Sequence, residues 1–151
     1  MTHVRFITLA ALGSAFLLAG AFVFQILGYA PCTMCIWQRY PHVLAVLIGL
    51  IAWRINHALV ILAGAGAVFT SGAIGVFHAG VEQGWWQGPT TCTAGPVGDL
   101  SPEELLNQIL TAPLVQCDQI AWQMMGISMA GWNAILSFGL TALWLLALKR
   151  R

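Results

Sequence analysis

Four cysteines are the residues of this chain whose type and spacing could do chemistry. Two of them, Cys32 and Cys35, are separated by two residues, and the other two stand far downstream at Cys92 and Cys117. A CxxC spacing brings two sulfurs close enough to close a small ring, and such motifs often lower the pKa of one thiol. Two potential pairs of thiols therefore suggest an exchange of electrons between dithiols.

Cys35 is the best candidate among the four for a stabilised thiolate. If a helix begins near this residue, its sulfur lies at the helix N-terminus, where the helix dipole favours negative charge. Arg39 follows four residues later, so it lies on the same helical face and adds positive charge there. We assign Arg39 to supporting the thiolate and to holding the polar head of an electron acceptor. The alternative is an arginine that only reaches toward lipid headgroups.

The downstream cysteines have two interpretations. If Cys92 and Cys117 pair, they could be a loop staple that contributes about 3–4 kcal/mol in the chain-entropy model. They could instead be a second redox pair that hands electrons to the first through mixed disulfides. Two pairs in so small a protein favour the exchange. A zinc site is disfavoured because one CxxC lacks the second closely spaced ligand pair of a typical structural site, so we expect no metal.

The segments that must position these thiols are typical of a membrane protein. The chain has 151 residues, of which 59% are hydrophobic and 7% are charged, whereas soluble proteins carry about 25% charged residues. Crossing a bilayer core takes roughly 20 apolar residues in a helix, because lipid offers no partner for open backbone groups. We predict an all-α membrane protein whose four transmembrane helices cover residues of about 6–27, 35–53, 58–80 and 130–148.

The basic residues indicate the orientation of these spans. Arg5 precedes the first span, Arg54 lies in the turn between the second and third, and Lys149–Arg151 follows the fourth. Four spans place all of them on one side, which the positive-inside rule makes cytoplasmic. Both termini are then cytoplasmic, and the four cysteines face the periplasm of a bacterium, where disulfides persist. A cleaved signal peptide in place of the first span would leave the same cysteine orientation. No basic patch lies away from the membrane ends, so nothing suggests nucleic-acid binding.

The residues from about 81 to 129 are too polar to span the bilayer and are predicted to form a long periplasmic loop. Within it, Ser101 fits a helix cap, Pro102 the first helical position and Glu104 the third residue after the cap. A helix of about ten residues is marginal alone in water. We therefore expect it to lie on the bilayer, the bundle or a partner through one apolar face, which comprises Leu105, Leu106, Ile109 and Leu110.

His78 is the remaining candidate, at the outer end of the third span. Its imidazole could bind the oxygen of a quinone. It could equally be an ordinary histidine at the membrane interface, because a lone histidine at a helix end carries no specific signal.

The combination of these features resembles the disulfide bond formation protein B (DsbB) family of bacterial inner-membrane thiol oxidases. The resemblance covers nearly the whole chain, and it is the combination rather than the CxxC alone that is specific. The features that carry it are the four spans, Pro31–Cys35 followed by Trp37-Gln38-Arg39-Tyr40, the histidine that ends the third span, Gly84–Cys92 and Cys117-Asp118-Gln119.

The resemblance implies a route for electrons. A reduced periplasmic thioredoxin-fold protein of the DsbA type would attack a Cys92–Cys117 disulfide and form a mixed disulfide with Cys92. Cys117 would then attack Cys32 of a Cys32–Cys35 disulfide, which releases Cys35 toward bound ubiquinone or menaquinone. Arg39 and His78 would hold the quinone. That the acceptor is a quinone is implied only by the resemblance. The implied partners are thus the thioredoxin-fold protein, the quinone pool and membrane lipid.

Two other interpretations remain at this point. A thiol enzyme of the vitamin K epoxide reductase type also uses four helices and a relay, but that family is expected to carry its CxxC in a later helix. A disulfide-stapled membrane subunit without catalysis is a different class, and it predicts that serine at Cys32 and Cys35 is tolerated.

Overall fold

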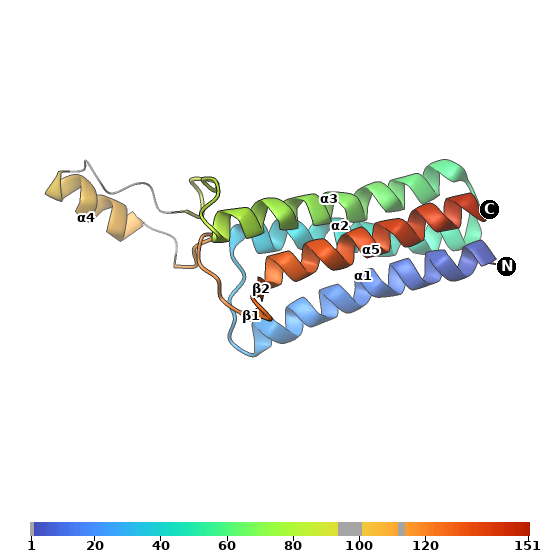
Figure 1. The fold of residues 1–151 in the computed structure, drawn as a ribbon, viewed down its shortest axis with the longest axis horizontal. Helices are drawn as coiled ribbons and strands as arrows, with labels where there is room; N and C mark the ends of the chain where they lie inside the picture. The colour runs from blue at the N-terminus through green and yellow to red at the C-terminus, as the bar shows by residue number, and fades with distance from the viewer. Residues whose placement is uncertain (1, 94–100, 112–113) are drawn as a thin grey trace.

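The computed structural model describes residues 2–93, 101–111 and 114–151 and contains a bundle of four long helices (Figure 1). Each of the four is long and apolar enough to cross a membrane, so the chain is a multi-pass membrane protein and the predicted fold class is confirmed. The helices begin and end within a few residues of the predicted spans. Their bounds are α1 (Thr2–Ile26), α2 (Thr33–Arg54), α3 (Ala58–Glu82) and α5 (Met129–Lys149).

Successive helices of the bundle run in opposite directions, and the two termini lie at the same end (Figure 1). The helix α3 packs against α2 and α5, while α1 packs against the same two helices from the other side. A buried apolar cluster occupies the half of the bundle nearest the termini and includes Ile7, Ile61, Val68 and the fully buried Trp144. The opposite end is where α2 begins and α3 ends, and the cysteines lie there.

Small residues bring α3 and α5 close together, as membrane helices require when no water drives their association. A Cβ atom added at Gly75 of α3 would lie 2.9 Å from the carbonyl oxygen of Ala130 and 3.1 Å from the amide nitrogen of Ala134 in α5. A Cβ atom at Gly64 would lie 2.6 Å from the ring of Trp144. These two glycines therefore fix the spacing of the helices that carry much of the site.

A short hairpin leads into α5, and the sequence did not predict it. Its strands β1 (Gln123–Met124) and β2 (Ile127–Ser128) pair antiparallel. The two turn residues, Met125 and Gly126, have φ values of 54° and 77°, as a two-residue hairpin turn of right-handed twist requires. The hairpin delivers Ser128 as the N-cap of α5, where its hydroxyl accepts a hydrogen bond from the Gly131 amide at 3.2 Å.

The short helix α4 (Pro102–Thr111) lies where the capping signal predicted it. The Ser101 hydroxyl accepts a hydrogen bond from the Glu104 amide at 3.3 Å, and the Glu104 carboxylate accepts one from the Ser101 amide at 2.8 Å, which is a capping box. None of its residues is buried, and it stands beyond the cysteine end of the bundle (Figure 1).

Candidate functional site

The first turn of α2 builds the CxxC pair. Cys32 is the N-cap of this helix, and its sulfur accepts a hydrogen bond from the Cys35 amide at 3.2 Å. Both residues are free thiols, with Cys32 buried and Cys35 half-buried. The Cys32 thiol donates a hydrogen bond to Cys35 Sγ at 2.9 Å. The two sulfurs are therefore already at the distance from which a disulfide can close.

The two thiols differ in their surroundings. The hydrogen bond to Cys35 and burial raise the pKa of the Cys32 thiol above its ordinary value, because both favour the protonated form. Cys35 Sγ is the acceptor in that bond and lies in the first turn of α2, where the helix dipole favours negative charge. The geometry agrees with the interpretation of Cys35 as the thiolate, which stays a prediction.

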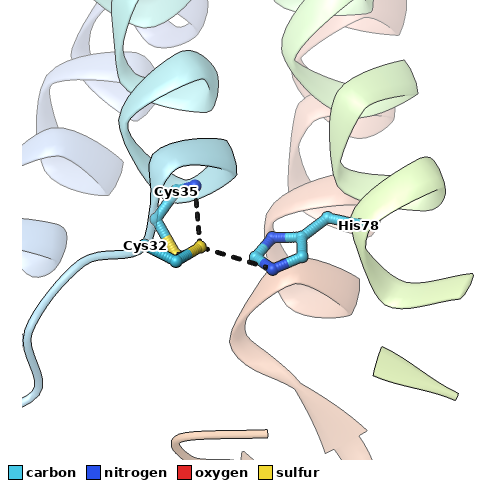
Figure 2. A group of neighbouring side chains, drawn as sticks. All are labelled: Cys32, Cys35 and His78. Atoms are coloured by element: carbon cyan, nitrogen blue, oxygen red, sulfur yellow. Dashed lines mark hydrogen bonds between the residues drawn. The ribbon is translucent and has the colours of Figure 1, made fainter. Parts of the chain in front are cut away.

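His78 reaches from the last turns of α3 toward the start of α2 (Figure 2). Its Nε2 lies 3.5 Å from Cys32 Sγ. The side chain is buried, with 3% of its surface exposed. The sequence left two alternatives for this residue, a quinone contact or an interfacial histidine; the structure places it in the interior of the bundle beside Cys32.

A polar network inside the bundle holds the imidazole of His78. Gln38 Nε2 lies 2.9 Å from His78 Nδ1 and also donates to the Met34 carbonyl at 3.2 Å. Gln38 Oε1 accepts a hydrogen bond from Asn133 Nδ2 at 2.8 Å, and Asn133 Oδ1 lies 3.1 Å from His42 Nε2. Sequence reasoning gave no role to Gln38 or Asn133. Their signal was that both are amides within predicted membrane spans, where polar groups are expensive.

Glu82 is a third residue that the sequence did not single out. It lies one helical turn after His78, with its Oε1 3.8 Å from His78 Nε2, and its side chain is only 6% exposed. The available signal was its spacing of four residues from His78 at the end of an apolar stretch. Within the described residues, Cys32, Cys35 and His78 also form a group whose ligand atoms lie within 4.8 Å of one another.

The other cysteine pair is closed. Cys92 and Cys117 form a disulfide, with their Cα atoms 5.3 Å apart, and the Cys117 amide donates a hydrogen bond to the Cys92 carbonyl at 2.7 Å. Both are fully buried, in one cluster with Cys32, Met34 and Val81, against which Cys35 packs. The structure thus brings together all four cysteines that the sequence selected.

Arg39 lines a cavity of about 500 Å³ that also exposes Cys32, Cys35 and His78. Its guanidinium donates hydrogen bonds to Gln25 Oε1 at 2.7 Å and to the Ala21 carbonyl at 3.3 Å, both in α1. The same group lies 5.2 Å from the ring centre of Phe22, at the range of a cation–π contact. Arg39 is therefore held by α1 at the wall of the cavity, whose lining also includes apolar side chains of α1, of α5 and of the segment that precedes α5.

Comparison with known proteins agrees with the resemblance. The model of a family described as disulfide bond formation protein DsbB matches residues 3–147. The disulfide bond formation protein B of Verminephrobacter eiseniae is 31% identical, over 99% of this chain and 88% of the relative. Those of Albidiferax ferrireducens (30%, over 95% and 83%) and Polaromonas naphthalenivorans (28%, over 95% and 90%) are similar. No solved structure matches this chain.

Proposed function

Because this chain belongs to the disulfide bond formation protein DsbB family, whose members are disulfide-forming membrane oxidoreductases, we propose that it oxidises a periplasmic dithiol protein and passes the electrons to membrane quinone. The net reaction converts a protein dithiol and a quinone into a protein disulfide and a quinol. The observation that carries the proposal is the shared buried cluster, in which a closed and an open cysteine pair pack beside one cavity.

The first half of the relay takes electrons from the partner. A thiolate of a reduced thioredoxin-fold protein attacks Cys92, which forms a mixed disulfide and releases Cys117 as a thiolate. The second thiolate of the partner resolves that mixed disulfide, so the partner leaves oxidised. This transfer leaves Cys92 and Cys117 holding two electrons.

The second half moves those electrons within the protein. Cys117 attacks Cys32 of the Cys32–Cys35 disulfide and releases Cys35 as a thiolate; Cys92 then attacks Cys117 and closes the first disulfide again. The support for this order is the contact of all four cysteines in one cluster and the acceptor position of Cys35 in the hydrogen bond from Cys32. The Cys32–Cys35 pair is now reduced, as it is in the structure.

The quinone is the proposed final acceptor of the two electrons. The cavity suits its chemistry, because the walls are largely apolar while Cys35, Arg39 and His78 offer polar groups at one place. Arg39 would donate to a quinone oxygen, and His78 would supply a second polar contact. A bound quinone accepts two electrons and two protons, which lets the Cys32–Cys35 disulfide close again. Ubiquinone and menaquinone both meet these requirements.

The experiment is turnover by the full-length protein in detergent with a reduced DsbA-type protein and ubiquinone, followed by the loss of quinone absorbance. Wild-type protein should turn over, and Cys35→Ser should abolish quinone reduction while still forming a mixed disulfide with the partner. A non-catalytic, disulfide-stapled subunit predicts no turnover by either protein. Undiminished turnover by Cys35→Ser would contradict the proposed relay.

A further inference from the structure

We propose that the reduced Cys32–Cys35 pair, together with His78 and Glu82 of α3, is a binding site for a thiophilic divalent cation such as Zn²⁺. The site exists only while the pair is reduced, because a disulfide takes both sulfurs out of use as thiolate ligands. Binding displaces protons from the thiols and moves no electrons. The inference does not depend on quinone as the electron acceptor.

The first argument is the geometry of the sulfur and nitrogen donors. Cys32 Sγ lies 2.9 Å from Cys35 Sγ and 3.5 Å from His78 Nε2 (Figure 2), and all three atoms lie within 4.8 Å of one another. Tetrahedral zinc, with Zn–S near 2.3 Å and Zn–N near 2.0–2.1 Å, sets its ligands roughly 3.5–3.8 Å apart. The sulfur–nitrogen separation already fits, and the two sulfurs need to part by about 1 Å.

Glu82 lies next to these three donors, outside the group within 4.8 Å, and completes the set once its side chain turns toward the sulfurs. Its Oε1 lies 3.8 Å from His78 Nε2, and its side chain is 6% exposed. Its Oε2 is buried without a hydrogen-bond partner among the described residues. A buried carboxylate oxygen without a partner is costly, and a cation beside the two sulfurs would satisfy it. Two thiolates, one imidazole and one carboxylate are all donors that zinc accepts.

The polar network around the donors holds the imidazole of His78 in place. A histidine that binds metal through one nitrogen usually donates its other N–H to an acceptor that fixes the ring. Here the Gln38 carboxamide lies 2.9 Å from His78 Nδ1. For Nδ1 to donate, this amide must turn over and exchange its hydrogen bonds with the Met34 carbonyl and the Asn133 amide.

The sequence argued against zinc because a second closely spaced ligand pair was missing. The fold provides that pair from another helix, since His78 and Glu82 are four residues apart on one face of α3 and α3 packs against α2. The cluster therefore differs from the structural finger that the sequence disfavoured. The thiols come from the start of α2 and the other donors from the end of α3, so the site forms only where these helices pack and only while the thiols are reduced.

The test uses Co²⁺ as a spectroscopic probe of zinc sites. The double variant Cys92→Ser/Cys117→Ser, in full-length protein, leaves Cys32 and Cys35 as its only thiols. When reduced, it should bind one Co²⁺ per chain with sulfur-to-cobalt charge-transfer absorption and tetrahedral ligand-field bands, and Zn²⁺ should displace the Co²⁺. The same protein oxidised to the Cys32–Cys35 disulfide should show neither band.

Substitutions of the proposed ligands, made in the Cys92→Ser/Cys117→Ser protein, decide which side chains bind the metal. His78→Ala and Glu82→Gln should each weaken the affinity by at least about tenfold, whereas His57→Ala, an exposed histidine at the other end of α3, should leave it unchanged. If the double variant fails to fold, the same titrations on fully reduced wild type, His78→Ala and Glu82→Gln compare the affinities directly. Absence of the charge-transfer band, or equal affinity after His78→Ala, overturns the proposal. In either result the quinone reaction of the wild type is unaffected, so the two proposals fail separately.

Discussion

The hydrogen bond between Cys32 and Cys35 makes the two thiols of one motif unequal. Cys32 donates and Cys35 accepts, so we predict that the proton stays on the buried sulfur and that Cys35 carries the negative charge. A relay needs this inequality, because the cysteine attacked from the loop pair and the cysteine facing an acceptor have different tasks. The chemistry of the site thus begins with a single interatomic contact.

Alkylation should reveal the inequality as a difference in pH dependence. Because the pKa of the Cys32 thiol is raised, folding favours its protonated form, and this stabilisation is present below the ordinary thiol pKa and is lost as the pH rises toward the raised value. In Cys92→Ser/Cys117→Ser, mass spectrometry should find Cys35 alkylated by iodoacetamide near pH 7 and Cys32 only at strongly alkaline pH. Equal rates at pH 7 would contradict the assignment. Cys35→Ser, which removes the sulfur acceptor, should bring the reactivity of Cys32 to lower pH.

Arg39 should affect the quinone and not the protein partner. Its guanidinium makes two hydrogen bonds to α1 at the cavity wall, a geometry that the single ammonium of lysine cannot reproduce. Hydrogen bonds to charged groups contribute about 1.5–3 kcal/mol, so Arg39→Lys should raise the KM for ubiquinone roughly tenfold or more in steady-state assays. The KM for the reduced partner should stay unchanged. A rise in the partner's KM instead would place Arg39 outside the quinone site.

At the scale of elements, the sequence was sufficient wherever one helix contains the whole signal. The four spans follow from uninterrupted apolar length, and α4 follows from the capping box at Ser101 and Glu104. The expected interaction of Arg39 with Cys35 rests on helical spacing alone and stays a prediction, because the printed contacts of Arg39 are with α1. Gln38 and Asn133 could not be found in this way, because each acquires its role from a residue of another helix. Glu82 was missed although it lies four residues after His78 on the same helix, because that spacing alone is a weak signal. The β1–β2 hairpin was missed because its Met-Gly turn is a weak signal and its strands have two residues each.

The close approach of α3 and α5 predicts opposite effects for two glycines of one helix. A Cβ atom at Gly75 would meet backbone atoms of α5 at 2.9 and 3.1 Å, whereas one at Gly66 would meet nothing within 4 Å. Gly75→Ala should therefore lower the free energy of unfolding by about 1–3 kcal/mol. Gly66→Ala should leave it unchanged or raise it by up to about 1 kcal/mol. Thermal unfolding in one detergent measures both, and equal behaviour of the two variants would show that α3 and α5 are not tightly packed at Gly75.

At the scale of the whole molecule, the basic residues that flank the spans lie at the opposite end of the bundle from the cysteine cluster. Arg54 lies at the end of α2 and Lys149 at the end of α5, at the same end of the bundle as both termini, while the cysteine cluster lies at the opposite end (Figure 1). Four spans of this length leave no route by which a soluble partner on the side of the termini could reach Cys92. The direction of insertion therefore decides whether the chemistry is available to a periplasmic protein.

We predict that insertion follows the positive-inside rule and places the cysteine end in the periplasm. After mild reduction of intact spheroplasts, a membrane-impermeant maleimide should label Cys92, while a cysteine introduced by Arg151→Cys should react only after lysis. The matched control labels the same two positions in inverted vesicles, where the cysteine at position 151 should react at once and Cys92 only after lysis. Labelling of Cys92 only in the inverted vesicles would place the cysteines on the cytoplasmic side, where thiols are kept reduced. A relay that ends in a stable exported disulfide would then have no substrate, whatever the geometry of the cluster.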